Sequence, residues 1–191
     1  MKSWPLSELT DMTIIAITGF MAAGKTTVAR ELARHLNYPV LDLDDLIIER
    51  ECCSIRELIE QLGEPGFRNI ETDVLRQFFV DNSSAVIALG GGAWTIERNR
   101  ELIADHGAIS VWIDVPFEVC WSRIEETMGT RPFARDRDST SALFQTRLPL
   151  YEKTSVHVKL TGHEPASSIA ETIAIRINEH TTSTNKSKLL K

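Results

Sequence analysis

The sequence contains few cysteines and no recognisable metal-binding pattern. Its three cysteines, Cys52, Cys53 and Cys120, are an odd number and have neither zinc-site spacing nor a disulfide framework. We expect reduced and mostly buried thiols, with a redox-active pair at Cys52 and Cys53 as the alternative. The five histidines form no HExxH or related ligand pattern, so they predict no metal site.

Long apolar runs and an excess of basic charge are also missing, which limits the partners of the chain. No stretch approaches the roughly 18 consecutive apolar residues of a membrane span. The N-terminal stretch MKSWPLSELTDMT lacks the apolar segment of a signal peptide, so we expect a cytoplasmic protein with no membrane partner. The net charge of -6 is unlike that of general nucleic-acid binders, which carry a basic surface, so we expect no nucleic-acid partner. Any anionic ligand must therefore be held by locally placed cations.

The composition is that of one compact domain. With 191 residues, of which 42% are hydrophobic and 25% charged, the chain has enough apolar material for a single core. We expect this domain to span residues 13–180 and to act as a monomer. An N-terminal extension (1–12) precedes it, and a polar tail (181–191), predicted to be disordered, follows it.

Five short apolar runs alternate with helical patterns. The predicted strands are 13–18, 39–43, 85–89, 109–115 and 156–160. Helices are predicted from near Lys25, from Ser54, after Pro65, over 96–106, after Pro116, around Leu143 to Leu150, and over 167–178. This alternation favours an α/β three-layer sandwich with a five-stranded parallel sheet. Ligands of such sheets bind beyond the carboxyl ends of the strands, so the segments after the first three strands are expected to share one site.

The segment after the first predicted strand has the pattern of a phosphate-binding loop. GFMAAGKTT (19–27) matches G-x-x-x-x-G-K-[ST] at Gly19, Gly24, Lys25 and Thr26, between a strand and a helix. Backbone N–H groups of such a loop surround phosphate oxygens, the lysine reaches the β and γ phosphates, and the hydroxyl binds magnesium. The alternative, an ordinary strand-to-helix turn, is disfavoured by the full match and its context.

Three aspartates follow the second predicted strand. If the extended conformation continues, Asp42 and Asp44 project to the same side, toward the ligand. One carboxylate then belongs to the magnesium shell and the other accepts a proton from an attacking hydroxyl. The alternative is that these acids only cap the next helix, a role that fits Asp45 best.

Three consecutive glycines and a loop arginine are further candidates. Gly90, Gly91 and Gly92 end the third predicted strand and are expected to let a ligand approach the backbone closely, with a flexible turn as the alternative. Residues 127–140 hold three arginines and almost no core residues, so they predict a mobile surface loop. Within that loop, Arg131 either closes over the phosphates or is a solvated side chain.

Two single arginines lie on apolar helices. Arg68 in GFRNIE and Arg147 in TRLPLY each present a planar fork that suits a carboxylate of a ligand. The alternative is a structural ion pair with Glu71 or Glu152.

In this combination and order, the segments resemble the shikimate kinase family, small P-loop kinases of the nucleoside monophosphate kinase type. The similarity runs from about residue 14 to residue 178 and includes GFMAAGKTT, DLD (42–44), GFRNIE (66–71), GGG (90–92), VWIDVPFEVCWSRI (111–124), RP (131–132) and RLPLY (147–151). The resemblance implies a P-loop NTPase fold with a mobile lid at about 127–140. It also implies transfer of the ATP γ-phosphoryl group to the 3-hydroxyl of shikimate, in aromatic amino-acid (chorismate) biosynthesis, with Mg²⁺ as cofactor.

The resemblance also implies a role for each matching residue. Asp44 contacts the ring hydroxyls as base or orienter, while the Asp42 and Thr26 side chains arrange magnesium. The acceptor is bound by Asp44, Arg68, Gly90, Gly91, Gly92 and Arg147, the two arginines holding its carboxylate. ATP is bound by Ala22, Ala23, Gly24, Lys25, Thr26, Thr27, Arg123, Arg131 and Pro165, with Lys25 and Arg131 stabilising the transferring group.

The sequence departs from the family pattern at Ala22, among other positions, and leaves three alternative functions open. Ala22 stands where family members usually carry glycine, so we expect backbone strain there if the loop needs a positive φ angle. A related small-molecule kinase, such as one acting on gluconate, shares the phosphate loop but not the acceptor pocket. A nucleotide-binding switch is disfavoured because no NKxD element lies in the predicted domain. A non-catalytic relative is disfavoured because the candidate catalytic residues occur together.

Overall fold

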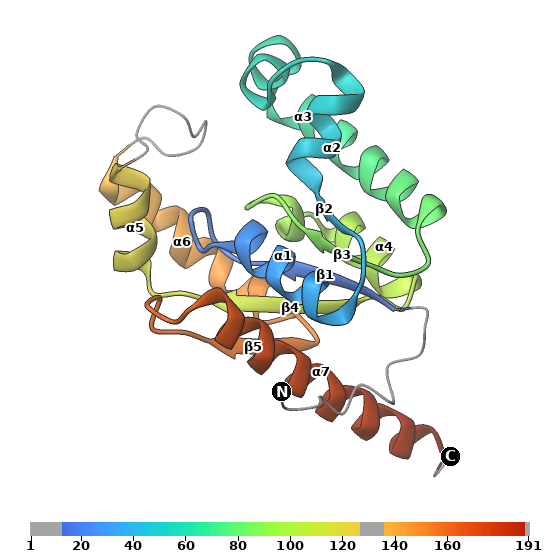
Figure 1. Cartoon of the computed structure of the whole chain (residues 1–191). Helices are drawn as coiled ribbons and strands as arrows, with labels where there is room; N and C mark the ends of the chain where they lie inside the picture. The colour runs from blue at the N-terminus through green and yellow to red at the C-terminus, as the bar shows by residue number, and fades with distance from the viewer. Residues whose placement is uncertain (1–12, 127–135, 190–191) are drawn as a thin grey trace.

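The computed structural model describes residues 13–126 and 136–189, with side chains as far as Ser183, and it contains one parallel sheet (Figure 1). The strands are β1 (Ile14–Thr18), β2 (Val40–Asp42), β3 (Ala85–Ala88), β4 (Ile109–Asp114) and β5 (Val156–Lys159). They follow the order β2-β3-β1-β4-β5, and every neighbouring pair is parallel. The predicted five-stranded parallel α/β architecture is therefore confirmed.

Helices cover both faces of the sheet. The helices are α1 (Lys25–Leu36), α2 (Leu43–Glu51), α3 (Ile55–Asp81), α4 (Glu97–Asp105), α5 (Phe117–Glu125), α6 (Arg137–Tyr151) and α7 (Ala166–Leu189), with one 3-10 turn, η1 (Ala93–Thr95). Helices α1 and α7 pack together on one face, while α4 and α6 lie on the other (Figure 1). Helix α2 and the first part of α3 project beyond the sheet.

The central strands form the core because they are apolar along their whole length. Every residue of β1 and of β3 is buried, as expected for parallel strands that helices cover on both faces. The tight turn after β1 requires a glycine: a Cβ atom at Gly19 would lie 2.7 Å from the carbonyl oxygen of Ile113. The phosphate loop is thereby held against β4.

The region after β2 differs from its prediction. The strand ends at Asp42 and helix α2, which the sequence did not predict, begins at the next residue. The Asp42 side chain accepts a hydrogen bond from the backbone N–H of Asp44 at 3.0 Å and so caps the helix. Leu43 and Ile47, four residues apart, are both buried, which fixes the inner face of this short helix.

Helix α3 joins the two helices predicted between residues 54 and 80. Ser54 and Glu57 form a capping box at the predicted helix start, because each side chain pairs with the backbone N–H of the other residue. A kink at Gly63, with φ 69° and ψ 170°, separates the two halves. Pro65, which has no N–H to donate, lies two residues after Gly63. The first half can therefore point away from the sheet while the second packs against α4.

Three further predictions need correction or fall outside the described chain. Residues 127–135 of the predicted lid lie outside the described residues, but Arg137 to Thr140 form the first turn of α6, capped by Asp136. Helix α7 continues to Leu189, beyond the predicted end at residue 178, because no glycine or proline interrupts it, and it includes most of the polar tail.

The thiols and the surface complete the comparison with the sequence. Only Cys120 is buried, whereas Cys53 is half-buried and Cys52 is exposed on the turn after α2, so the expectation of mostly buried thiols is wrong. Within the described parts of the chain, no helix combines the length and apolar character that a membrane span requires.

Candidate functional site

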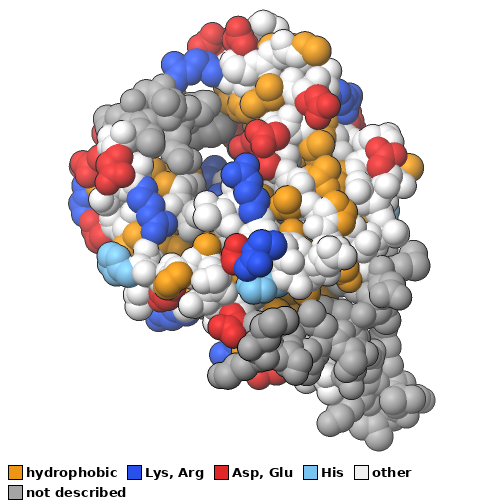
Figure 2. Space-filling view, in the orientation of Figure 1, with side chains coloured by type: hydrophobic (Ala, Val, Ile, Leu, Met, Phe, Trp, Pro, Cys, Tyr) orange, Lys and Arg blue, Asp and Glu red, His pale blue; other side chains and the backbone are white. Residues whose placement is uncertain are grey.

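A cavity of about 860 Å³ opens beyond the carboxyl ends of β1, β2 and β3. Figure 2 shows a hollow near the centre of one face, with basic side chains in and beside it. The residues that line the cavity are Met21, Ala22, Gly24, Lys25, Thr26, Thr27, Asp42, Asp44, Ile48, Ser54, Ile55, Arg56, Phe67, Arg68, Glu71, Leu89, Gly90, Gly91, Gly92, Arg123, Glu126 and Arg147. The segments after the first three strands therefore share one site, as the sequence predicted.

The phosphate loop forms one wall of the cavity. Gly24 precedes α1 with φ 93°, and no side chain caps the first N–H groups of this helix. An uncapped helix start of this kind is suited to a phosphate group. The Lys25 ammonium donates to the carbonyl oxygen of Phe20 at 2.9 Å. Ala22 has φ 61°, so the strain expected at this position is confirmed.

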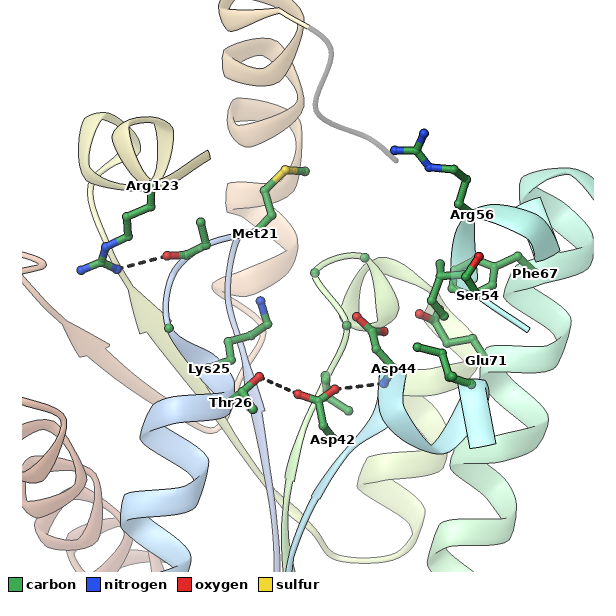
Figure 3. Close-up of a pocket in the computed structure, with 18 of the residues that line it drawn as sticks. Met21, Lys25, Thr26, Asp42, Asp44, Ser54, Arg56, Phe67, Glu71 and Arg123 are labelled. Carbon is green, nitrogen blue, oxygen red and sulfur yellow. Dashed lines mark hydrogen bonds between the residues drawn. The ribbon is translucent and has the colours of Figure 1, made fainter. Parts of the chain in front are cut away.

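A hydroxyl and a carboxylate meet beside Lys25 (Figure 3). Thr26 Oγ1 donates to Asp42 Oδ2 at 2.5 Å, while the other oxygen of Asp42 accepts the N–H of Asp44. Such hard oxygen donors fit Mg²⁺, which usually keeps water and substrate phosphates as its other ligands. Among the described residues, no group of three or more His, Cys, Asp or Glu side chains could hold a metal ion.

Asp44 faces the cavity from the first turn of α2, not from an extended strand as predicted. Its carboxylate lies against the glycines, since a Cβ atom at Gly90 would lie 2.7 Å from Asp44 Oδ1. Burial raises the pKa of Asp44, and the charge of Asp42 adds to the rise; Lys25 and Arg68 oppose it. The helix-capping alternative also holds in part, because Asp42 caps α2 while Asp44 remains directed at the cavity (Figure 3).

Arg68 forms a buried ion pair with Glu71, the structural partner that the sequence left open. Its Nη1 atom lies 2.9 Å from both carboxylate oxygens, and its Nη2 atom lies 3.2 Å from Glu64 Oε1. Burial raises the pKa of Glu71 to about 7, although the Arg68 charge works in the opposite direction. The guanidinium also lies against Gly92, where a Cβ atom would approach Arg68 Cζ to 2.9 Å.

Arg147 reaches the same wall from α6. Its Nη1 atom donates to the carbonyl oxygen of Gly91 at 2.9 Å, and the Tyr151 hydroxyl donates to the same oxygen at 2.8 Å. The arginine therefore pairs with a backbone carbonyl rather than with Glu152, and it stays directed toward the cavity that it lines. All three glycines lie close to other atoms of the protein: Gly90 to Asp44, Gly91 to Met21 and Gly92 to Arg68.

The remaining nucleotide candidates have different positions. Arg123 donates to the carbonyl oxygen of Ala22 at 3.1 Å and to that of Gly162 at 2.6 Å, behind the phosphate loop. The Ala23 side chain is buried in the core and does not line the cavity. Pro165 does not line it either. Arg131 lies outside the described residues.

Several cavity residues were missed by the sequence. Arg56 lies on the first turn of α3, across the cavity from the phosphate loop, and Met21 and Phe67 contribute apolar surface (Figure 3). No sequence motif marks Arg56. The only indirect signal is the capping box at Ser54, because it fixes where the helix starts and thus which residues its first turn carries.

Comparison with known proteins identifies the family. The family model described as shikimate kinase matches residues 21–178. The chain belongs to the shikimate kinase family. A shikimate kinase of Nostoc punctiforme is 38% identical over 171 residues, which cover 88% of this chain and 92% of that protein.

Solved structures agree with the family. The shikimate kinase of Acinetobacter baumannii in complex with shikimate is 31% identical, with a TM-score of 0.80 and coverage of 88% of this chain and 94% of that one. The shikimate kinase of Aquifex aeolicus is also 31% identical, with a TM-score of 0.77 and coverage of 88% and 98%. A gluconokinase of Sinorhizobium meliloti, at 18% identity, a TM-score of 0.59 and coverage of 90% and 97%, shares the fold alone.

Membership of the shikimate kinase family confirms the predicted class of activity, an ATP-dependent phosphotransferase acting on a hydroxyl of shikimate, on a P-loop kinase fold.

Proposed function

We propose that the chain transfers the γ-phosphoryl group of ATP to the 3-hydroxyl of shikimate within the described cavity. The observation that carries this proposal is that Lys25, on the phosphate loop, and Asp44, on α2, line one cavity together with Arg68 and Arg147. A phosphoryl donor and an anionic acceptor can thus bind side by side.

The donor side consists of the loop, Lys25 and the Thr26–Asp42 pair. Backbone N–H groups at the start of α1 bind the phosphates, and the Lys25 ammonium exchanges its carbonyl partner for phosphate oxygens. Mg²⁺ would be held by Thr26 and Asp42, and it would supply charge neutralisation to the transferring group. Arg123 steadies the loop from behind through the carbonyl of Ala22 and borders the adenine side, together with Pro165.

The acceptor side combines two cations with one carboxylate. Arg68 and Arg147 bind the carboxylate of shikimate, and the three glycines let the ring approach the backbone. Asp44 contacts the hydroxyl that is phosphorylated and either removes its proton or orients it. Its raised pKa makes it a better base than an exposed aspartate.

Positioning supplies most of the acceleration in this scheme, because phosphoryl transfer demands little covalent work from the protein. We propose that Arg131 closes over the phosphates as the sequence suggests. All proposed ligand contacts come from one chain, so the reaction requires no second subunit.

An ADP-release assay tests the function directly. We expect ATP turnover that depends on both shikimate and Mg²⁺, with gluconate giving no stimulation. Stimulation by gluconate and not by shikimate would favour the related small-molecule kinase instead. Nucleotide binding without any turnover in the presence of shikimate would favour a non-catalytic role.

A further inference from the structure

We propose that Thr72 and Asn99, which lie behind the cavity, are positioning residues. They hold Arg68 and the three glycines in a fixed relation and thereby set the affinity of the cavity for the acceptor. The inference rests on the proposed function, because Arg68 is taken to bind the acceptor carboxylate. Neither residue lines the cavity, so both act through their neighbours.

A buried hydrogen bond links α3 to α4 at this point. Thr72 lies one helical turn after Arg68 and is 3% exposed, while Asn99 on α4 is fully buried. Thr72 Oγ1 lies 2.7 Å from Asn99 Oδ1, and Asn99 Nδ2 donates to the carbonyl oxygen of Ala93 at 3.0 Å. The asparagine thus bridges α3 and η1, the turn that directly follows the glycines.

The partners determine the direction of each hydrogen bond. Because the Ala93 carbonyl only accepts, the amide nitrogen of Asn99 must face it, and the amide oxygen then faces Thr72. The single proton of the Thr72 hydroxyl therefore goes to Asn99 Oδ1. The carbonyl oxygen of Arg68, 2.9 Å from Thr72 Oγ1, has a second donor in Arg98 Nη2, also at 2.9 Å.

Arg98 closes this network from the surface. Its Nε atom donates to Thr72 Oγ1 at 2.9 Å, and Nη2 reaches both the Arg68 carbonyl oxygen and Asn69 Oδ1. Each polar side-chain atom of Thr72 and Asn99 thus has a hydrogen-bond partner, which favours a single defined arrangement of this buried pair. Arg98 donates to the backbone carbonyl of Arg68 and to the Thr72 hydroxyl. That hydroxyl in turn donates to Asn99.

The network meets the acceptor pocket on both sides. Ala93, held by Asn99, donates its N–H to the carbonyl oxygen of Gly90 at 3.1 Å, which joins η1 to the glycines. The Arg68 guanidinium lies directly against Gly92, so a small rotation of α3 relative to η1 would move the cation into or away from the glycine backbone. Affinity for a carboxylate depends on that placement, because charge-assisted hydrogen bonds to a planar fork are directional.

The test compares two substitutions of one side chain. Thr72→Val keeps the shape but removes the hydroxyl, whereas Thr72→Ser keeps the hydroxyl. We expect Thr72→Val to raise the KM for shikimate about tenfold, the scale of one lost buried hydrogen bond. The KM for ATP is expected to change by less than about twofold, and Thr72→Ser is expected to stay near wild type in all parameters.

A second variant approaches the network from its exposed end and remains informative if Thr72→Val does not fold. Arg98→Met removes the donors to Thr72 and to the Arg68 carbonyl, and we expect the KM for shikimate to rise at least about threefold. Glu101→Gln, an exposed change on the same helix, is the control and should leave this KM unchanged.

Distinct outcomes separate the two proposals. The inference is overturned if the wild-type protein turns over shikimate normally and neither Thr72→Val nor Arg98→Met raises the KM for shikimate. It is also overturned if the variants change both KM values and kcat together, since that pattern indicates general loss of structure. A wild-type protein without shikimate-dependent ADP release overturns the proposed function and this inference with it.

Discussion

At the scale of single residues, the Asp44 side chain combines burial with a nearby positive charge. It lies at the start of a helix that Asp42 caps, yet it is largely enclosed by the cavity wall at Gly90. Burial raises its pKa, while Lys25 keeps an opposite charge within reach. This balance fits the role proposed for Asp44, in which its ionised carboxylate accepts a proton from a hydroxyl or orients that hydroxyl.

Substitution of Asp44 measures that role. We expect Asp44→Asn to lower kcat by about a hundredfold or more, the scale of a lost general base, while the KM for ATP stays near wild type. Steady-state kinetics with varied ATP and shikimate provide the measurement. Asp45→Asn, at the exposed neighbouring position, is the matched control and should retain activity. Full turnover by Asp44→Asn would show that this carboxylate is not required.

The raised pKa of Glu71 leads us to expect that the stability of the protein depends on pH. Its pKa is raised to about 7 in the folded protein, above the usual value of 4.5, so between these values the folded chain binds more protons than the unfolded chain. Stability from this group is therefore fully present below the unfolded pKa and is lost as pH rises through about 7. We expect the unfolding free energy of ligand-free wild type to fall between pH 5 and 8 by ~2 kcal/mol more than that of Glu71→Gln. Urea unfolding across this range measures the difference, and the exposed change Glu60→Gln is the control. Parallel curves of unfolding free energy against pH for wild type and Glu71→Gln would contradict the assignment.

Ala22 is a strained position in the phosphate loop. A left-handed conformation costs an alanine about 1–2 kcal/mol, while a glycine there adds some entropy to the unfolded chain. We therefore expect Ala22→Gly to stabilise the protein by ~0.5–1 kcal/mol in urea unfolding, with little effect on the KM for ATP. Ala23→Gly is the control: Ala23 is buried and not at positive φ, so its change should destabilise. Equal losses for both variants would mean that no strain is relieved.

At the scale of elements, α3 determines where Arg56 and Arg68 lie on the cavity wall. Its first half carries Arg56 and its second half carries Arg68, and the kink at Gly63 lies between them. The φ and ψ angles of Gly63, 69° and 170°, fall in a region that is essentially reserved for glycine. The position of Arg56 relative to Arg68 is therefore set by this one backbone conformation.

Replacement of Gly63 should change both stability and acceptor binding. We expect Gly63→Ala to cost about 1–3 kcal/mol of stability and to raise the KM for shikimate more than the KM for ATP, because the first half of α3 shifts. Gly107→Ala is a matched control, since Gly107 has φ 64° with no atom near its would-be Cβ, in the turn between α4 and β4. That control should lose stability without a change in either KM. Similar kinetics in both variants would indicate that the kink does not position the site.

The elements also show where sequence reasoning was sufficient and where it was not. The strands and the phosphate loop were predictable because buried apolar runs and a fixed glycine spacing are local signals. Helix α2 was not predictable. Only nine residues separate β2 from the next turn, and the DLD motif is equally compatible with a strand end and with a helix start. Asp44 was nevertheless placed correctly, because both readings direct a side chain near Asp42 toward the ends of the strands.

The hydrogen-bond and ion-pair partners of the side chains were harder to predict than the positions of the residues. The sequence could not decide between ligand and Glu71 as partners of Arg68, and the structure shows that the ion pair and a cavity-lining position coexist. The network of Thr72, Asn99 and Arg98 has no sequence signal, because its members lie on different helices and meet only after the chain has folded. Contacts of this kind are set by tertiary packing and not by local pattern.

At the scale of the whole molecule, the distribution of charge is uneven. The net charge is -6, yet the cavity wall is slightly basic. Five basic side chains, Lys25, Arg56, Arg68, Arg123 and Arg147, face four acidic ones, Asp42, Asp44, Glu71 and Glu126. Anionic substrates are thus drawn to one place on a surface that otherwise repels them.

Arg56 is suited to test this effect because it is exposed and lies across the cavity from the phosphate loop (Figure 3). We expect Arg56→Gln to raise the KM for shikimate about threefold at low salt, with a smaller effect near physiological salt, where exposed charges are screened beyond roughly 8 Å. Kinetics at several ionic strengths provide the measurement. Arg30→Gln, an exposed change on α1 outside the cavity, has the same net charge and should leave the KM unchanged. If both variants respond equally to salt, the total charge of the molecule matters and the local placement of Arg56 does not.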